Sequence, residues 1–223
     1  MELLLGIVKH SGFVAITYKM TLDIETIYAE LNNLYREWFY VLPKNRNILF
    51  WFSKDAQKCD KFLKSYENLL ITLASDSSFR IFIWTHATIR QRIAMIILFD
   101  QIPRHIYRGS RFMYDFDDIS LQMAKSIKFN QLNQREMVFA IMPFEHSEKL
   151  NAHRLGLKIL LRYKQNHLET SMLTKTIQQF KKHTDVLKKF GEYPKRRLDY
   201  GEKINEMPDE IKEYIKNSSH PYI

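Results

Sequence analysis

Cysteine, glycine and proline are all scarce in this chain of 223 residues, and each scarcity excludes a class of protein. The single cysteine, Cys59, has no partner for an internal disulfide, so the sequence does not require an oxidising compartment. Six Gly and six Pro, with 45% apolar and 26% charged residues, argue against disorder and against a turn-rich β-sandwich. We therefore expect one compact, mainly helical domain in a reducing cytoplasm.

A long hydrophobic run is also missing. The opening stretch, MELLLGIVKHSGFVAITYKM, has two apolar segments, but Lys9 and His10 interrupt them. Without a cationic start or a small-residue cleavage site, this stretch predicts neither a signal peptide nor a membrane span. Ser11 and Gly12 suit a tight turn between alternating residues, so a short N-terminal β-hairpin is one interpretation.

The net charge of +9 is compatible with nucleic acid as a partner. Most basic residues, however, are scattered along the expected helices. The densest patch runs from Lys181 to Lys203, where eight Lys and Arg accompany four Asp and Glu. Its ordinary interpretation is a solvated helix face, so nucleic-acid binding is less favoured but not excluded.

Apolar residues recur at spacings of three and four along most of the chain, which is typical of amphipathic helices. The expected helices span about 21–38, 62–73, 88–97, 119–127, 134–141, 149–163 and 170–190, with a last short helix after Pro208. Asp115 or Asp117 is expected to cap the fourth of these helices, and Gly191 to close the helix that ends at Phe190. Short links between helices favour hairpins, so we predict an all-α fold of stacked antiparallel helical hairpins.

Three polar clusters interrupt this helical pattern, and the first is DQIPRH, residues 100–105. Asp100 lies on the apolar face of the preceding helix, so we expect it to point inward, where a carboxylate needs a partner. Arg104 is the nearest candidate, and Arg108 is also within reach. In the competing interpretation this cluster is only a helix end, at which Pro103 stops the helix and Arg104 bonds the last carbonyls.

The second cluster is PFEHSE, residues 143–148. His146 changes charge near neutral pH, and an orienting carboxylate from Glu145 or Glu148 would make it a general acid or base. The alternative is again structural: Pro143 ends one helix, Ser147 caps the next, and His146 has no chemical role.

The third cluster is HTDVLKKFGEYPKRR, residues 183–197. His183 shares the apolar face of its helix, so it should point toward the core or a cleft. After the Gly191 turn, Arg196 or Arg197 can fold back toward the end of the same helix.

In this order, the clusters resemble the motifs of a bacterial family of unknown function. Its members carry FWF, then DQFPRN followed by RG, then P-x-x-HSE, and finally a His before FGRFPHRN. The matching residues here are Phe50, Trp51 and Phe52; Asp100, Gln101, Pro103, Arg104, Arg108 and Gly109; Pro143, His146, Ser147 and Glu148; and His183, Phe190, Gly191, Pro194 and Arg196 or Arg197. The chain departs from the pattern at His105, Glu192 and Leu198, where the family has Asn, Arg and Asn.

The resemblance implies a fold of the tetratricopeptide-like helical superfamily and a shared polar set, but no established reaction. It divides the chain into an N-terminal extension that packs on the core, residues 1–47, a family domain, residues 48–206, and a short C-terminal helix and tail, residues 207–223. Because the motifs specify Asp, Arg, Glu and two His, which capping does not require, the resemblance favours a functional pocket.

The favoured hypothesis is an enzyme, a hydrolase or lyase that acts on a small anionic substrate. In it, His146 is the acid or base oriented by Glu148, His183 is a second proton carrier, and Asp100 completes the catalytic set. The residues expected to bind the ligand are Gln101, Arg104, Arg108, Ser147 and Arg196. The sequence does not identify a cofactor.

Three alternatives stay open. His146, Glu148 and His183 offer enough nitrogen and oxygen donors for zinc or iron, but their spacing matches no dedicated metal motif, so we predict no metal site. The helices can instead form an interaction module whose groove binds a peptide or a partner helix, with Trp38, Tyr40, Trp51 and Trp84 as lining aromatics. Nonspecific nucleic-acid binding through residues 181–203 is the third.

Overall fold

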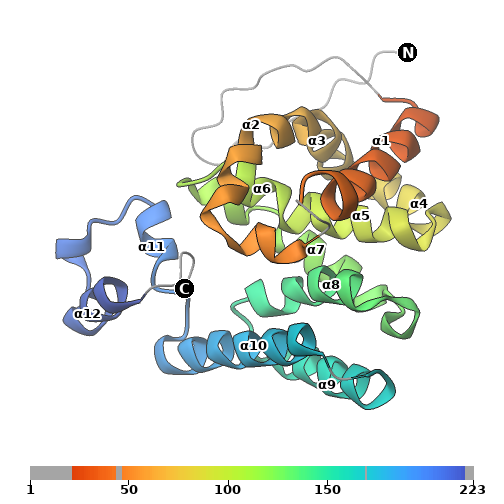
Figure 1. Ribbon diagram of the computed structural model, residues 1–223. Helices are drawn as coiled ribbons and strands as arrows, with labels where there is room; N and C mark the ends of the chain where they lie inside the picture. Colours follow the sequence, from red (N-terminus) through yellow and green to blue (C-terminus); the bar gives the residue numbers. More distant parts are fainter. Residues whose placement is uncertain (1–21, 44–46, 169, 219–223) are drawn as a thin grey trace.

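The computed structural model of the chain describes residues 22–43, 47–168 and 170–218, which are helices and the turns that join them (Figure 1). No β-strand occurs within those ranges, and the all-α prediction is confirmed. The β-hairpin considered for the N-terminus falls in residues 1–21, outside the described residues.

The central element is α5, Ile89–Asp100, which packs against α1, α7 and α8. Thr88 starts it with a capping box, in which its hydroxyl accepts a hydrogen bond from the Gln91 amide and the Gln91 side chain bonds back. Every residue from Ile93 to Asp100 is fully buried, because neighbouring helices cover α5 on several sides. This environment carries the Asp100 carboxylate into the interior.

The first helix, α1, Ile24–Arg36, follows the predicted apolar stripe and covers one side of α5. Asp23 caps it by accepting a hydrogen bond from a backbone amide of the first turn at 2.7 Å. A π-helical turn, Glu37–Val41, extends it and buries Trp38. Trp38 stacks on Trp51 with ring centroids 3.7 Å apart, so these two rings are part of the core and do not line a groove.

Residues 48–86 form a run of short helices. They are the 3₁₀ helices Ile48–Phe52 and Lys54–Cys59, α2 Asp60–Leu63, the 3₁₀ turn Lys64–Tyr66, α3 Glu67–Ser75 and α4 Ser77–His86. The sequence predicted one helix over 62–73 that ends in the polar SDSS stretch, and it missed α4. Asp76 explains the miss, because it ends α3 and also caps α4 by accepting from the Phe79 amide at 2.9 Å.

Two prolines were expected to end helices: α5 does end at Asp100, before Pro103, but Pro143 lies inside a helix. Pro103 is in the first turn of α6, Ile102–Ile106, where backbone amides have no partner within the helix. Pro143 lies inside α8, Gln134–His146. It removes one backbone donor, but α8 continues because it packs against α5, α7, α9 and α10. The elements between α6 and α8 are the 3₁₀ turn Arg111–Tyr114, α7 Asp117–Ser126 and the 3₁₀ turn Phe129–Gln131.

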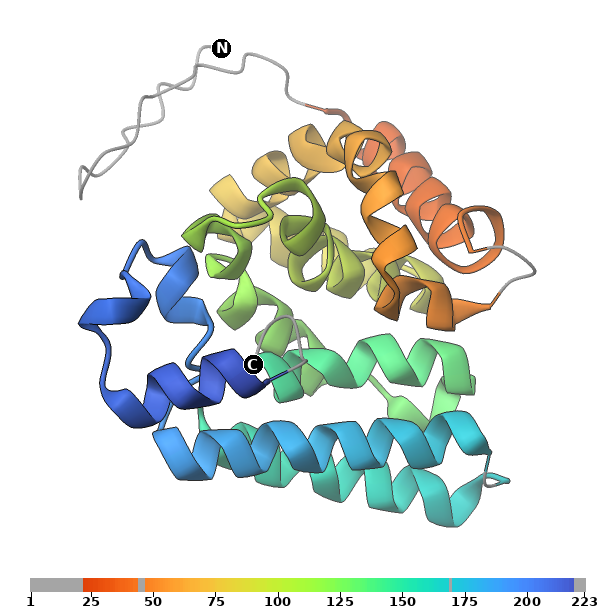
Figure 2. The same cartoon turned by 60° about the vertical axis from the view of Figure 1, so that its left-hand side comes forward.

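The helices α9, Leu150–Asn166, and α10, Ser171–Phe190, form an antiparallel pair that packs against α8 (Figures 1 and 2). Gly156 lets them approach, since a Cβ at this position would lie 2.5 Å from the Phe180 ring. The helix α10 ends at Gly191 with φ of 77°, as predicted. Beyond it lie α11 Arg196–Asp199, the 3₁₀ turn Ile204–Glu206 and α12 Asp209–Asn217, near the C-terminal end of α10 (Figure 2).

Candidate functional site

The polar clusters of the sequence meet where the ends of α5, α8 and α11 come together. Asp100 ends α5, His146 ends α8 and Arg196 begins α11. The His146 ring contacts Asp100, and the His146 carbonyl accepts a hydrogen bond from Arg196. Packing therefore brings the first cluster, the second cluster and an arginine of the third into one buried network.

Asp100 and His146 form the centre of this network. His146 Nδ1 lies 2.8 Å from Asp100 Oδ1, and Asp100 is fully buried. Burial by itself would raise the pKa of the Asp100 carboxyl, but His146, Arg104 and a hydrogen bond from Gln101 Nε2 together hold it below its ordinary value. The carboxylate is therefore ionised at neutral pH and accepts a hydrogen bond from the Nδ1–H group of His146.

This contact has a consequence for the other ring nitrogen of His146. When Nδ1 carries the proton of the neutral ring, the lone pair lies on Nε2. Nε2 has no hydrogen-bond partner among the described residues, and the His146 side chain keeps 11% of its surface exposed. The ring is thus held through Nδ1, while Nε2 is left without a hydrogen bond in the described part of the chain.

Arg104 and Arg196 converge on one carboxylate, that of Asp117. Arg104 Nη2 donates to Asp117 Oδ1 at 2.8 Å, and Arg196 Nη2 lies 3.2 Å from Asp117 Oδ2. Both guanidinium groups also face the Tyr114 ring, with Cζ atoms 5.7 and 4.2 Å from its centroid. Burial disfavours a charge on Arg104, but Asp117 and Asp100 outweigh it and raise the Arg104 pKa, so this guanidinium stays charged.

Each arginine also bonds the backbone end of a helix. Arg104 Nη1 donates to the Asp100 carbonyl, which the helix-end interpretation predicted, and Arg196 Nη2 donates to the His146 carbonyl at 2.7 Å. Two buried atoms of this group, Asp117 Oδ2 and Arg196 Nε, have no hydrogen bond within the described residues. A buried polar atom left unsatisfied costs about 1–3 kcal/mol. Asp117 therefore does not use all the hydrogen-bonding groups of the two arginines.

Asp117 is a site residue that sequence reasoning missed. With Asp115 it was expected to cap α7, but the residue before α7 is Phe116, and no side chain caps this helix. Asp117 is the first residue of α7 and turns its carboxylate to the two arginines. The sequence held a signal, an excess of acidic residues at a helix start, but capping explained it equally well.

Glu148 does not orient His146, because Asp100 takes that position. Glu148 Oε1 accepts from the Tyr193 amide at 2.7 Å, and Oε2 lies 3.7 Å from Arg196 Nη1. Ser147 Oγ accepts from the Lys149 amide at 3.3 Å, but Lys149 is the residue before α9 and no side chain caps this helix, so the predicted Ser147 cap is wrong. Both side chains therefore hold the start of α9 and the loop before α11.

His183 lies in a neighbouring layer on α10. Its Nδ1 is 2.8 Å from Glu145 Oε1 and 3.0 Å from the Gln179 carbonyl oxygen, and the residue is 3% exposed. Burial would lower the His183 pKa, but Glu145 and the Gln179 carbonyl raise it above its ordinary value. The hydroxyl of Tyr193, whose ring lies edge-on to His183, donates to the Glu145 carbonyl. The Glu145 and His183 pair thus fixes the last turn of α8.

His153 is a buried residue that the sequence did not single out. Its Nε2 lies 2.8 Å from the Ser147 carbonyl oxygen and 3.1 Å from the Tyr193 hydroxyl, and its Nδ1 lies 2.9 Å from Thr184 Oγ1. Burial lowers the His153 pKa, so the ring is neutral and donates from Nε2 to the Ser147 carbonyl. No local pattern could reveal this role, because Thr184 lies 31 residues away.

Arg108 does not join the network, although it was expected to bind the ligand. Its Nε and Nη2 contact the two oxygens of Asp60 at 2.8 and 3.0 Å, and His105 Nδ1 contacts the same carboxylate at 2.7 Å. The His105 ring lies edge-on to Trp38 and Trp51. This second group ties α6 to α2, and Arg108 belongs to it.

The metal alternative finds no support in the described ranges, where no group of three or more His, Cys, Asp or Glu side chains is arranged to hold a metal ion. The three ligands considered bond different partners: His146 contacts Asp100, His183 contacts Glu145, and Glu148 contacts a backbone amide.

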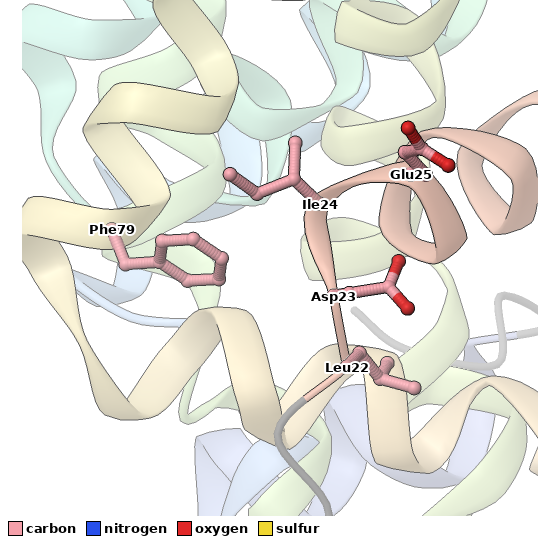
Figure 3. A pocket seen from close by; sticks show the side chains of 5 residues that line it. All are labelled: Leu22, Asp23, Ile24, Glu25 and Phe79. Carbon is pink, nitrogen blue, oxygen red and sulfur yellow. The ribbon is translucent and has the colours of Figure 1, made fainter. Parts of the chain in front are cut away.

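Two hollows lie outside the network. One, of about 550 Å³, lies at the start of α1 between Ile24 and Phe79 (Figure 3). The other, of about 650 Å³, runs along α9 beside the 3₁₀ turn Phe129–Gln131. His146, Arg104 and Arg196 line neither of them.

By its fold and by this network, the chain is a helical protein in which His, Asp and Arg side chains form a buried network at the helix ends. No described helix is long and apolar enough to cross a membrane. The chain belongs to a family of bacterial proteins of unknown function, DUF924, whose model matches residues 34–206. This confirms the prediction of a bacterial family of unknown function with a helical fold.

A solved structure of a protein of unknown function from Agrobacterium tumefaciens, ATU0120, has a similar fold. It superposes with a TM-score of 0.67 and 20% sequence identity over 88% of this chain and 100% of that chain. At this identity the likeness shows the fold alone. A search of curated proteins found no match.

Proposed function

We propose that this chain is an enzyme in which His146 acts as general acid or base on a small anionic substrate. One observation carries the proposal: a fully buried, ionised Asp100 holds Nδ1 of His146 and leaves Nε2 without a partner in the described residues. Helix capping does not require this geometry, because a cap needs one oxygen at a backbone amide and no histidine. Hydrolases and lyases both move a proton at such a site.

Asp100 would act as the orienting carboxylate. Asp100 accepts a hydrogen bond from Nδ1–H, so the lone pair of His146 stays on Nε2, where it can take a proton from water or from a substrate carbon. Asp100 also stabilises the imidazolium that forms. Gln101 supports Asp100 through its hydrogen bond to Oδ2 and is a positioning residue in this proposal.

Arg104 and Arg196 would bind the substrate anion in exchange for Asp117. Asp100, Asp117 and Glu148 already bring three negative charges to two arginines, so an added anion is poorly neutralised while Asp117 stays in place. The Asp117 side chain is 14% exposed, and its Oδ2 has an ion pair with Arg196 but no hydrogen bond. A rotation of this side chain toward solvent would free both guanidinium groups for bidentate binding.

His183 and Glu148 take supporting roles in this proposal. His183 was expected to be a second proton carrier, but its Nδ1 is bonded to Glu145 and to a backbone carbonyl. We assign it to holding the last turn of α8, which carries His146. Glu148 likewise holds the loop that presents Arg196, and Ser147 bonds the residue before α9.

The test is turnover that depends on His146. The protein is incubated with a pool of small carboxylates and phosphate esters, and substrate loss is followed by mass spectrometry. His146→Ala should abolish every change that the parent protein produces, while the exposed control His86→Ala keeps it. Equal turnover in both variants, or no turnover by the parent protein across the pool, would refute the proposal.

The finer predictions from the sequence also stay proposals. Antiparallel packing of α9 on α10 supports a tetratricopeptide-like stack, and a single cysteine supports a cytoplasmic location. The division at residues 47 and 206 stays a proposal as well. Nucleic-acid binding by residues 181–203 is less favoured, because several cations are paired: Lys188 with Asp185, Lys189 with Glu210 and Arg197 with Glu192, at 3.5, 3.0 and 2.6 Å.

A further inference from the structure

Two stretches of the chain outside residues 181–203 carry Lys and Arg but no acidic residue. Residues 119–135 contain three Lys and Arg, residues 149–168 contain five, and neither stretch contains an Asp or Glu. The two stretches meet in space, because the 3₁₀ turn Phe129–Gln131 packs beside α9. Together they form a surface on which cations have few acidic neighbours.

The hollow of about 650 Å³ lies between these two stretches and has an apolar floor. Phe129, Leu155, Ile159 and Tyr163 line it, and Leu155 is 41% exposed. The Tyr163 ring is fixed, because its hydroxyl donates to a backbone carbonyl at 2.8 Å and the His167 ring stacks on it at 3.8 Å. The floor is thus a rigid, partly exposed apolar surface.

Cations border this floor along α9. Lys158 and Arg162 line the hollow, and Arg154 continues the row at the same spacing of four residues. All three are exposed, and none forms an ion pair within the described residues. Unpaired cations beside an apolar floor favour a partner that carries carboxylates and apolar side chains together.

We propose that this groove binds an acidic amphipathic helix of a partner protein. From Leu155 to Asn166, α9 extends about 16 Å, which matches about three turns of a bound helix. Apolar side chains on one face of that helix would cover Leu155 and Ile159. Glu and Asp beside them would pair with Lys158 and Arg162. This proposal does not depend on acid–base chemistry at His146.

Other occupants fit less well. Residues 1–21 of the same chain contain two Lys and one Glu, so their charge does not complement the groove. Nucleic acid is favoured by flat stacking surfaces, whereas aliphatic Leu155 and Ile159 form much of this floor. An anionic membrane would meet the outer rim of a concave surface first and leave its floor uncovered.

The test is selection from a random library of peptides of about twelve residues, followed by affinity measurement with labelled peptides. Sequences enriched on the parent protein should combine Asp or Glu with apolar residues at spacings of three and four. The double variant K158E/R162E should bind them at least about tenfold more weakly, since two attractive contacts become repulsive. Leu155→Ser should also weaken binding. Raised salt should weaken binding by every variant that keeps Lys158 and Arg162, and should have little such effect on K158E/R162E.

The control is the double variant K181E/K182E, which changes the net charge equally at two exposed lysines of α10. It should bind the selected peptides within about twofold of the parent protein, and circular dichroism should show all variants folded. Enrichment of peptides without acidic residues, or equal loss in both double variants, would overturn the proposal. So would anionic vesicles or single-stranded RNA that bind through Lys158 and Arg162 when no acidic peptide does.

Discussion

Replacing Asp117 with Ala tests whether Arg104 and Arg196 form an anion site. The substitution removes the carboxylate that both guanidinium groups contact, at 2.8 and 3.2 Å, and leaves space where it stood. Breaking a buried ion pair on one side typically costs about 3–5 kcal/mol. Because Arg104 keeps Asp100 and Arg196 keeps Glu148, both at 3.7 Å, we expect a loss near the lower end, about 3 kcal/mol of unfolding free energy.

A small anion should restore this loss if the arginines bind it. Urea unfolding is measured with sodium formate or with sodium chloride at equal ionic strength, which separates binding from screening. Formate binding to the folded state adds stability as RT ln(1 + [L]/Kd), about 2.7 kcal/mol at a hundredfold excess over Kd. The parent protein should gain far less, because Asp117 already occupies the arginines.

The matched control is Asp118→Ala, the next residue in the chain, whose side chain is 77% exposed and contacts Lys149. It should lie within about 0.5 kcal/mol of the parent protein and show no formate effect. If Asp117→Ala loses no more stability than this control, the arginines are not held by Asp117. If formate and chloride act alike on Asp117→Ala, the arginine pair is structural, and the anionic substrate in the proposed function is wrong.

Three further predictions concern packing and pH. Gly156→Ala should destabilise the protein by about 1–3 kcal/mol, because its Cβ would overlap the Phe180 ring; a stabilised variant, the usual result of Gly→Ala in a helix, would contradict the packing. Trp51→Ala should lower the free energy of unfolding in urea by about 3–5 kcal/mol, because Trp51 is buried against Trp38. Phe52→Ala should lower it by less than about 1 kcal/mol, because Phe52 is 55% exposed, and equal losses in the two variants would exclude Trp51 from the core. The His183 pKa is raised in the fold above its ordinary 6.5, so its stabilisation is complete below that pH and is lost as pH rises through the folded value. The gap in unfolding free energy between the parent protein and His183→Gln should therefore shrink from about pH 5.5 to 9, and a constant gap would exclude a charged pair.

Much of the fold could be predicted because each long helix has its own apolar stripe. The stripes of α1, α9 and α10 repeat every three to four residues, and burial follows them, whereas α5 is buried on all sides from Ile93 onward. The predictions failed where the same residue is compatible with two local structures. Asp76 ends one helix and starts another, and Pro143 lies within a helix that its neighbours hold together.

For the candidate site, the sequence by itself determined which groups are present and that Asp100 and His183 point inward, because helical spacing places them on apolar faces. Only the tertiary structure decided which groups meet. Asp100 contacts His146 across 46 residues of sequence, and Asp117, which looked like a helix cap, joins Arg104 to Arg196. The physical reason is that a side chain at a helix end takes its partner from whichever helix packs beside it, and spacing within one helix carries no information about that neighbour.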